Sequence, residues 1–139
     1  MRVVTKRISV DMEACADIRD VTADVAKSVA ESGLANGTVT VFCVGSTCAV
    51  STTEYEPGLL KDIPRALEAI APSDISYEHH KTWGDDNGSG HVRATLIGPS
   101  LTVPFVSGKL VLGTWQQIVL INLDTSGRKR DVVLQILGE

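Results

Sequence analysis

The sequence predicts an α+β fold in which a largely antiparallel β-sheet or β-sandwich is covered by two helices. Apolar residues recur at helical spacing in two segments of the first half of the chain. The second half is instead a series of short apolar runs divided by Gly, Pro and Ser turns. With 139 residues and a hydrophobic fraction of 43%, the chain can bury one core, and residues 1–139 are predicted to form a single domain.

The first elements are a strand and a helix. Val3–Val10 is rich in β-branched residues, which favour a strand, and the polar Asp11 ends it. A helix is expected from Asp17 to Gly33, because a glycine is suited to end a helix and the apolar residues between them share one helical face. These apolar residues are Ile18, Val21, Val25 and Val29.

Two extended segments and a second helix follow the turn at Asn36-Gly37. Thr38–Val44 and Ser46–Thr53 are predicted to be strands. The second helix begins near Pro64 or kinks there, because proline removes one backbone donor. Its apolar stripe is Leu59, Leu60, Ile63, Leu67 and Ile70.

The remaining chain predicts an antiparallel meander with short connections. Its expected strands are His91–Ile97, Leu101–Val106, Leu110–Leu112, Trp115–Leu123 and Asp131–Leu137.

Composition excludes several classes of function. Seventeen acidic against thirteen basic residues give a net charge of −4, which disfavours a nucleic-acid partner. No apolar run is long enough to span a membrane, and the first residues lack the apolar core of a signal peptide. A cytoplasmic location with reduced thiols is therefore expected, and Cys43 and Cys48 are predicted to be inert buried thiols.

All three histidines lie in one polar, glycine-rich stretch, Tyr77–His91. If the chain folds back between His79 and His91, the two imidazoles can form an acid/base pair or hold a divalent metal ion, with oxygens from Asp85, Asp86 and Asn87 nearby. A polar loop whose histidines cap backbone groups explains the same residues. His80 is expected to point away from His79, because neighbouring side chains of an extended segment face opposite sides.

Three further groups are candidates for binding. Arg128 and Arg130 lie on the same side of an extended chain and suit a phosphate or carboxylate, although a short basic run is also typical of a solvated surface. Trp115 can line a ligand pocket or pack in the core. Ser46 is a candidate nucleophile only if a base lies close to it.

Taken together, these stretches resemble the YjbQ family from about Thr38 to the C-terminus. The family's Y-x-H and D-N-x-x-x-H motifs match Tyr77, His79, Asp86, Asn87 and His91. Its G-x-S and P-x-x-x-G-x-L-x-L-G-T-W-Q motifs match Gly98, Ser100, Pro104, Gly108, Leu110, Leu112, Gly113, Thr114, Trp115 and Gln116. Its closing R-x-R matches Arg128 and Arg130.

The resemblance selects His79 over His80 and implies a homotrimer with pockets near subunit boundaries. It also implies activity as a secondary thiamine-phosphate synthase acting on a small phosphorylated molecule. His79 and His91 then transfer protons or bind metal, and Glu54 and Asn87 orient them. Substrate contacts are expected from Arg128, Arg130, Trp115, Gln116 and Ser46.

One position departs from the family pattern. Family members commonly have histidine where this chain has Ser46. Two alternatives stand beside the transferase, a metal-assisted hydrolase and a trimeric binding protein without turnover, and the departure at Ser46 favours the binding protein. The cofactor, if there is one, is not determined by the sequence.

Overall fold

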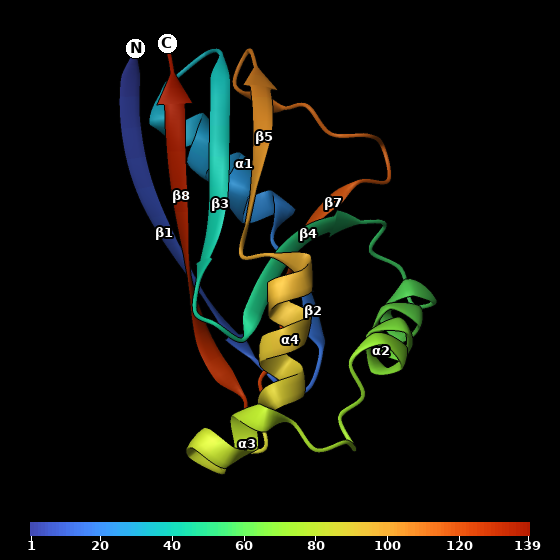
Figure 1. Ribbon diagram of the computed structural model, residues 1–139. Helices are drawn as coiled ribbons and strands as arrows, with labels where there is room; N and C mark the ends of the chain where they lie inside the picture. The colour runs from blue at the N-terminus through green and yellow to red at the C-terminus, as the bar shows by residue number, and fades with distance from the viewer.

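Two antiparallel sheets form the centre of the computed structural model, which describes residues 1–139 (Figure 1). The five-stranded sheet has the order β1 (Arg2–Met12), β8 (Arg128–Gly138), β3 (Gly37–Val44), β5 (Ser100–Val106) and β6 (Lys109–Leu110). The three-stranded sheet has the order β2 (Asp17–Asp20), β7 (Gln117–Asn122) and β4 (Cys48–Thr53). The helices are α1 (Thr22–Ser32), α2 (Leu59–Ile70), α3 (Glu78–Trp83) and α4 (Gly88–Ile97). The α+β class and the antiparallel pairing are confirmed.

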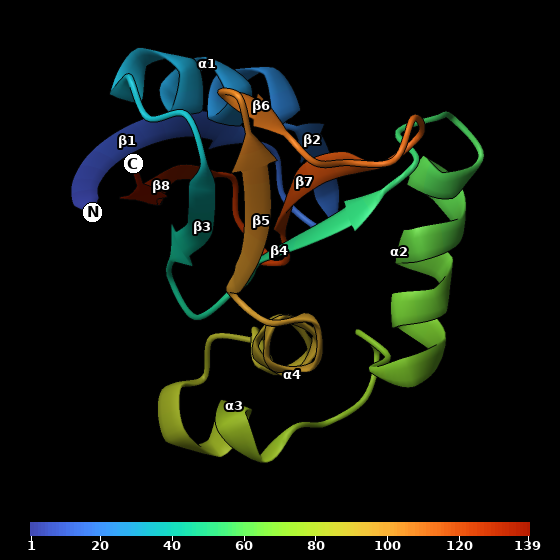
Figure 2. The same cartoon turned by 90° about the horizontal axis from the view of Figure 1, so that it is seen from above.

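The helices lie on opposite sides of the sheets, with α1 on one side and the other three on the other (Figure 2). The larger core lies between the two sheets and α1, whereas a smaller core joins the outer face of the three-stranded sheet to α2 and α4. Strand β7 contributes to both cores. Ile118 and Leu120 enter the larger one, and Val119 and Ile121 enter the smaller one. This double burial explains its uninterrupted apolar run.

Helix α1 buries Val25 and Val29 as predicted, but it begins at Thr22 rather than near Asp17. The preceding segment is strand β2, in which Ile18 pairs with Ile121. Ile18 fits the helical spacing of α1 by coincidence, because one buried residue of a short strand can stand at the right distance in sequence from the apolar face of the helix that follows. Helix α2 begins at Leu59, so Pro64 lies inside it rather than at its start.

The prediction of a loop followed by a strand at Tyr77–Ile97 is wrong, because the segment forms helices α3 and α4. The glycines in it serve close packing. A Cβ atom at Gly90 would lie 2.3 Å from the carbonyl oxygen of Leu123, and one at Gly88 would lie 2.5 Å from the Cβ of Tyr77. Helix α4 can therefore approach Leu123, just after β7, only with glycine at position 90, and Tyr77 only with glycine at position 88, although glycine is a weak helix former.

The predicted meander is also wrong. Strands β5 and β6 are neighbours, but β7 belongs to the other sheet and β8 lies between β1 and β3. Because Arg2 pairs with Gly138, the two chain ends lie side by side (Figure 1). Pairing of Met12 with Arg128 places the start of β8 at the opposite end of this sheet.

The cysteines differ from expectation as well. Cys43 and Cys48 are buried as predicted, but they are joined by a disulfide and are not separate thiols. The bond joins the end of β3 to the start of β4, and Cys15 is free and exposed. No helix has the length and apolar character needed to cross a membrane.

Candidate active site

A polar cleft of about 440 Å³ opens where both sheets end near α3 and α4. Five segments meet there: the β3–β4 loop, the connection between α3 and α4, helix α4 itself, the chain just after β7 and the start of β8. Its ten lining residues, none of which is hydrophobic, are Gly45, Ser46, Thr47, Asp85, Asn87, His91, Asp124, Arg128, Lys129 and Arg130. The structure thus brings the glycine-rich histidine segment and the basic cluster to one place.

Two of the histidines meet at the edge of this cleft. The rings of His79 on α3 and His91 on α4 have centroids 4.4 Å apart. Asp85 lies in the connection between these helices, and its Oδ2 is 3.1 Å from Nε2 of His79. One ligand atom from each of the three residues lies within 4.8 Å of the other two. The spacing of these residues in the helical hairpin therefore forms a compact group of two imidazoles and one carboxylate.

The third histidine is separate from this group. His80 packs edge-on against Tyr77, with ring centroids 6.0 Å apart. Its Nε2 is 3.2 Å from Oδ1 of Asp86, but this buried nitrogen has no partner with hydrogen-bond geometry. The two rings diverge because they lie on a helix, and not because the segment is extended as the sequence predicted.

The carboxylate of Asp85 is held in its charged form. Partial desolvation raises its pKa, but hydrogen bonds from the backbone N–H of Asn87 and from His79 lower it more, so that the pKa lies below the ordinary value. A charged carboxylate beside two imidazoles is suited to bind a metal cation or to orient the ring of His79.

A second carboxylate, Asp124, is the buried centre of the cleft. Its Oδ2 accepts hydrogen bonds from the Thr47 hydroxyl (2.9 Å) and the Asn87 amide (3.3 Å). Oδ1 accepts one from the backbone N–H of Ser126 (2.9 Å), and Nε of Arg128 approaches Oδ2 to 3.2 Å. Burial raises the pKa of Asp124, but these hydrogen bonds and the arginine charge outweigh it, and the net pKa is lowered.

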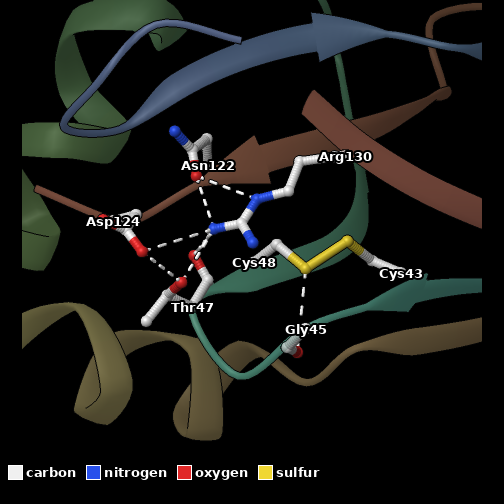
Figure 3. Close-up of a disulfide and its surroundings, with 7 residues drawn as sticks. All are labelled: Cys43, Gly45, Thr47, Cys48, Asn122, Asp124 and Arg130. Carbon is white, nitrogen blue, oxygen red and sulfur yellow. Dashed lines mark hydrogen bonds and ion pairs between the residues drawn. A yellow bond between two sulfur atoms is a disulfide. The ribbon is translucent and has the colours of Figure 1, made fainter. Parts of the chain in front are cut away.

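Arg130 lies beneath the cleft, and its contacts are drawn in Figure 3. Its Nε and Nη2 donate to the side-chain oxygen of Asn122, and Nη2 also donates to the backbone oxygen and the hydroxyl of Thr47. Nη1 takes no part in these bonds and lies against Gly45. Desolvation lowers the pKa of Arg130 despite the attraction of Asp124, but an arginine so affected still carries its charge at neutral pH.

Arg128 and Lys129 are the accessible cations of the cleft. The side chain of Arg128 is 53% exposed and uses only Nε to contact Asp124, so that both terminal nitrogens are available to a ligand. Arg130 also approaches Asp124, with Nη2 at 3.9 Å from Oδ2. The two arginines therefore lie on the same side of β8, as predicted from the alternation of side chains in an extended segment.

The other predicted residues divide into three groups. Ser46 and Asn87 line the cleft. Glu54 and Trp115 instead line a separate hollow of about 350 Å³. Gln116 lines neither of these; it lies in another hollow of about 360 Å³, where its amide nitrogen donates to Thr52.

The separation of these groups follows from strand register. Cys48 pairs with Asn122 beside the cleft, whereas Thr53 pairs with Gln117 at the other end of the same sheet. Five residues of extended chain span roughly 17 Å. Within one chain, the predicted orienting role of Glu54 and the predicted substrate contacts of Trp115 and Gln116 are therefore not combined with the histidine pair.

Sequence reasoning missed the polar residues that support the cleft, namely Thr47, Asn122 and Asp124. A signal for two of them was present, because Asn122 and Asp124 interrupt the apolar run that begins at Ile118. A buried polar residue at the end of a doubly buried strand requires partners nearby.

Comparison with known proteins agrees with this structure. Residues 6–139 match the family described as UPF0047 protein YjbQ-like. A UPF0047 protein of Methanothermobacter thermautotrophicus is 37% identical over 139 residues, which is 100% of this chain and 95% of that protein. One from Archaeoglobus fulgidus is 38% identical over 117 residues, covering 84% and 89% of the two chains.

Solved structures show the same fold. The crystal structure of a YbjQ-like protein of unknown function from Sulfolobus solfataricus superposes with a TM-score of 0.93 at 35% identity, covering 99% of each chain. A hypothetical protein from Aeropyrum pernix gives a TM-score of 0.91 at 34% identity, covering 98% of this chain and 99% of the other.

Proposed function

The chain belongs to the YjbQ family, and on that premise we propose that its polar cleft binds the phosphate groups of a small molecule and catalyses a reaction at them. One observation carries the proposal: accessible cations line a cleft without hydrophobic residues, and two members of the histidine–carboxylate group, Asp85 and His91, line the same cleft. Phosphate binding needs the first of these, and transfer or hydrolysis needs the second.

The cationic side of the cleft is suited to a pyrophosphate or a phosphate ester. The free terminal nitrogens of Arg128 form a fork that can bind two phosphate oxygens at once, and Lys129 adds a flexible ammonium group. The buried charge of Arg130 faces the carboxylate of Asp124, and two of its nitrogens already donate to the side-chain oxygen of Asn122. Arg130 therefore supports the site from below, while Arg128 provides the stronger contact.

The opposite side of the cleft is suited to a divalent metal ion. Ligands of a tetrahedral zinc ion lie about 3.4 Å apart, so the three candidate atoms of His79, Asp85 and His91 need only small movements to reach that geometry. Two imidazoles and one carboxylate would leave a position open for water or substrate. A metal bound there would act as a Lewis acid toward a phosphoryl oxygen. Without metal, Asp85 can orient His79 for proton transfer.

Two reactions and one non-catalytic role are consistent with this arrangement. The activity implied by the resemblance is thiamine-phosphate synthesis, in which a thiazole-phosphate nitrogen attacks the activated methylene of the pyrimidine and pyrophosphate leaves. Arg128 would then stabilise the leaving group. Metal-assisted hydrolysis of a phosphate ester is the second candidate. Binding without turnover is the third, because Ser46 cannot supply the imidazole that is common in the family at that position.

A homotrimer is part of the proposal. Trp115 is 71% exposed and Glu54 is also exposed, at the end of the sheet opposite the histidine pair. If subunits associate through this end, Trp115 and Glu54 of one subunit can complete the cleft of another. The cytoplasmic location expected from the sequence remains a prediction.

Calorimetric titration with inorganic pyrophosphate tests the binding claim. The wild-type protein is expected to bind it, and Arg128→Ala is expected to bind at least tenfold more weakly, because one charge-assisted hydrogen-bond fork is lost. Arg65→Ala removes an equally charged but distant side chain of α2 and serves as the matched control. Absence of binding to the wild type, or equal weakening by both substitutions, would contradict the proposal.

Assays of turnover then separate the three candidate functions. Thiamine-phosphate formation from its two phosphorylated precursors identifies the transferase, and release of inorganic phosphate from a simple ester identifies the hydrolase. Pyrophosphate binding with neither product favours the non-catalytic protein. Dependence of turnover on His91 would assign the reaction to this cleft.

A further inference from the structure

The disulfide adjoins the proposed phosphate site. Cys43 and Cys48 enclose Gly45, Ser46 and Thr47, which form one wall of the cleft. We call Gly45–Thr47 the cleft loop. Both cysteines are almost completely buried, at 0% and 1% exposure, between the end of β3 and the start of β4. The bond therefore fixes both ends of the cleft loop where the chain passes from one sheet to the other.

The cleft loop in turn holds Arg130. Thr47 accepts two hydrogen bonds from Nη2, at 2.7 Å to its hydroxyl and 3.1 Å to its backbone oxygen. Gly45 lies against the other terminal nitrogen so closely that a Cβ atom would be 2.9 Å from Nη1 and 3.2 Å from Sγ of Cys48. Figure 3 shows the guanidinium between Thr47 and the disulfide. The arginine and the bonded sulfurs thus share one packed space.

The same loop extends the contact to the carboxylate. The Thr47 hydroxyl donates to Asp124, which also binds Arg128. A displacement of the cleft loop would therefore change the positions of Thr47, Arg130 and Asp124 together, and with them the support for the accessible guanidinium of Arg128.

We propose that the Cys43–Cys48 disulfide positions the anion-binding half of the cleft, so that reductive opening of this bond weakens the binding of phosphate groups. The inference rests on the proposed function. The effect is expected to be selective, because the histidine–carboxylate group lies outside the loop that the disulfide closes. His79 is on α3, Asp85 is in the connection between the two helices, and His91 is on α4.

The chemical change is a two-electron reduction. A small dithiol breaks the S–S bond and is itself oxidised to a cyclic disulfide, while Cys43 and Cys48 each gain a proton as thiols. Because both sulfurs are buried, a large protein reductant cannot reach them without local opening of the structure. Reduction of the folded protein is therefore expected to be slow, and the bond serves as a stable clamp.

Pyrophosphate titration of the oxidised and dithiol-reduced protein tests the inference, with thiol counting to establish each state and circular dichroism to monitor folding. Reduction is expected to raise the dissociation constant at least fivefold while the secondary structure is retained. The Cys15→Ser variant removes the free thiol and is expected to behave like the wild type in both states. Equal affinities of the two states would overturn the inference but leave the phosphate site intact. If the oxidised protein does not bind pyrophosphate, both the proposed function and this inference fail.

A double-mutant cycle distinguishes positioning from general loosening. In Thr47→Val the link from the cleft loop to Arg130 is already weakened, so that opening the disulfide should reduce affinity much less than in the wild type. Fully additive effects would contradict positioning through Thr47. If the reduced protein unfolds, Gly45→Ala tests the contact between the cleft loop and Arg130 with the disulfide intact, because the added methyl would crowd Nη1 of Arg130. Unchanged pyrophosphate affinity in this variant would overturn the inference.

Discussion

Replacing Asp124 with asparagine is expected to destabilise the protein by about 3 kcal/mol, because no orientation of the amide satisfies the donors around it. The carboxylate accepts hydrogen bonds from Thr47, Asn87, Ser126 and Arg128. In one orientation of the asparagine, its NH₂ group replaces Oδ2 and faces the donors of Asn87 and Arg128. In the other, its NH₂ group replaces Oδ1 and faces the backbone N–H of Ser126, so a donor meets a donor in both cases. The substitution also leaves the buried charge of Arg130 without its nearest carboxylate.

This loss of stability should depend on pH. The folded-state pKa of Asp124 is lowered, so its contribution to stability is present above the unfolded-state pKa of about 4 and is lost as the pH falls through the lower folded-state value. Asparagine does not titrate. The stability difference between wild type and Asp124→Asn is therefore expected to be largest near neutral pH and to shrink below about pH 4.

Thermal unfolding followed by circular dichroism between about pH 3 and 7 measures both effects. At neutral pH the expected loss corresponds to a decrease in melting temperature of about 10 °C for a chain of this length. Asp131→Asn removes the same charge from an exposed position of β8 and is the matched control. The reasoning is refuted if the two variants melt within about 2 °C of each other, or if the difference from wild type does not narrow in acid.

Two further predictions concern packing and metal binding. Gly90→Ala is expected to lower the free energy of unfolding by about 2 kcal/mol in urea titration, because its Cβ would collide with the Leu123 carbonyl oxygen, whereas Gly113→Ala has room and should change little. A smaller effect at Gly90 than at Gly113 would show that α4 is not so closely packed. Protein purified without an affinity tag is expected to contain a divalent metal ion that His91→Ala loses and His80→Ala retains, as measured by elemental analysis. Retention of metal in His91→Ala would remove the metal site from the proposal.

Much of the fold was predictable because its signals are local. Strands β1, β3 and β5 coincide with β-branched runs, and the apolar stripe of α1 faces the larger core. Helix α4 was not predictable in this way. Gly88 and Gly90 weaken the helical signal in their own segment, and the reason for their presence lies in contacts with Tyr77 and Leu123 that only the folded chain creates.

The candidate site likewise combines features with a local sequence signal and features that depend on long-range contacts. The histidine segment and the basic cluster were evident as composition, and the resemblance joined them, but the sequence could not show that Asp124 lies between them. Burial of that carboxylate depends on the pairing of β7 with β4, which is a long-range property. The disulfide was also hidden, because cysteines five residues apart form no recognised pairing motif and are brought together by a loop between two sheets.

The most direct test of the phosphate site is a crystal structure of the protein grown with inorganic pyrophosphate. Electron density for the anion is predicted between Arg128, Lys129 and His91, with Arg130 still bound to Thr47 beneath it. Density only at the Glu54 and Trp115 end of the sheet, or none at concentrations that saturate binding in solution, would contradict the assignment of this cleft.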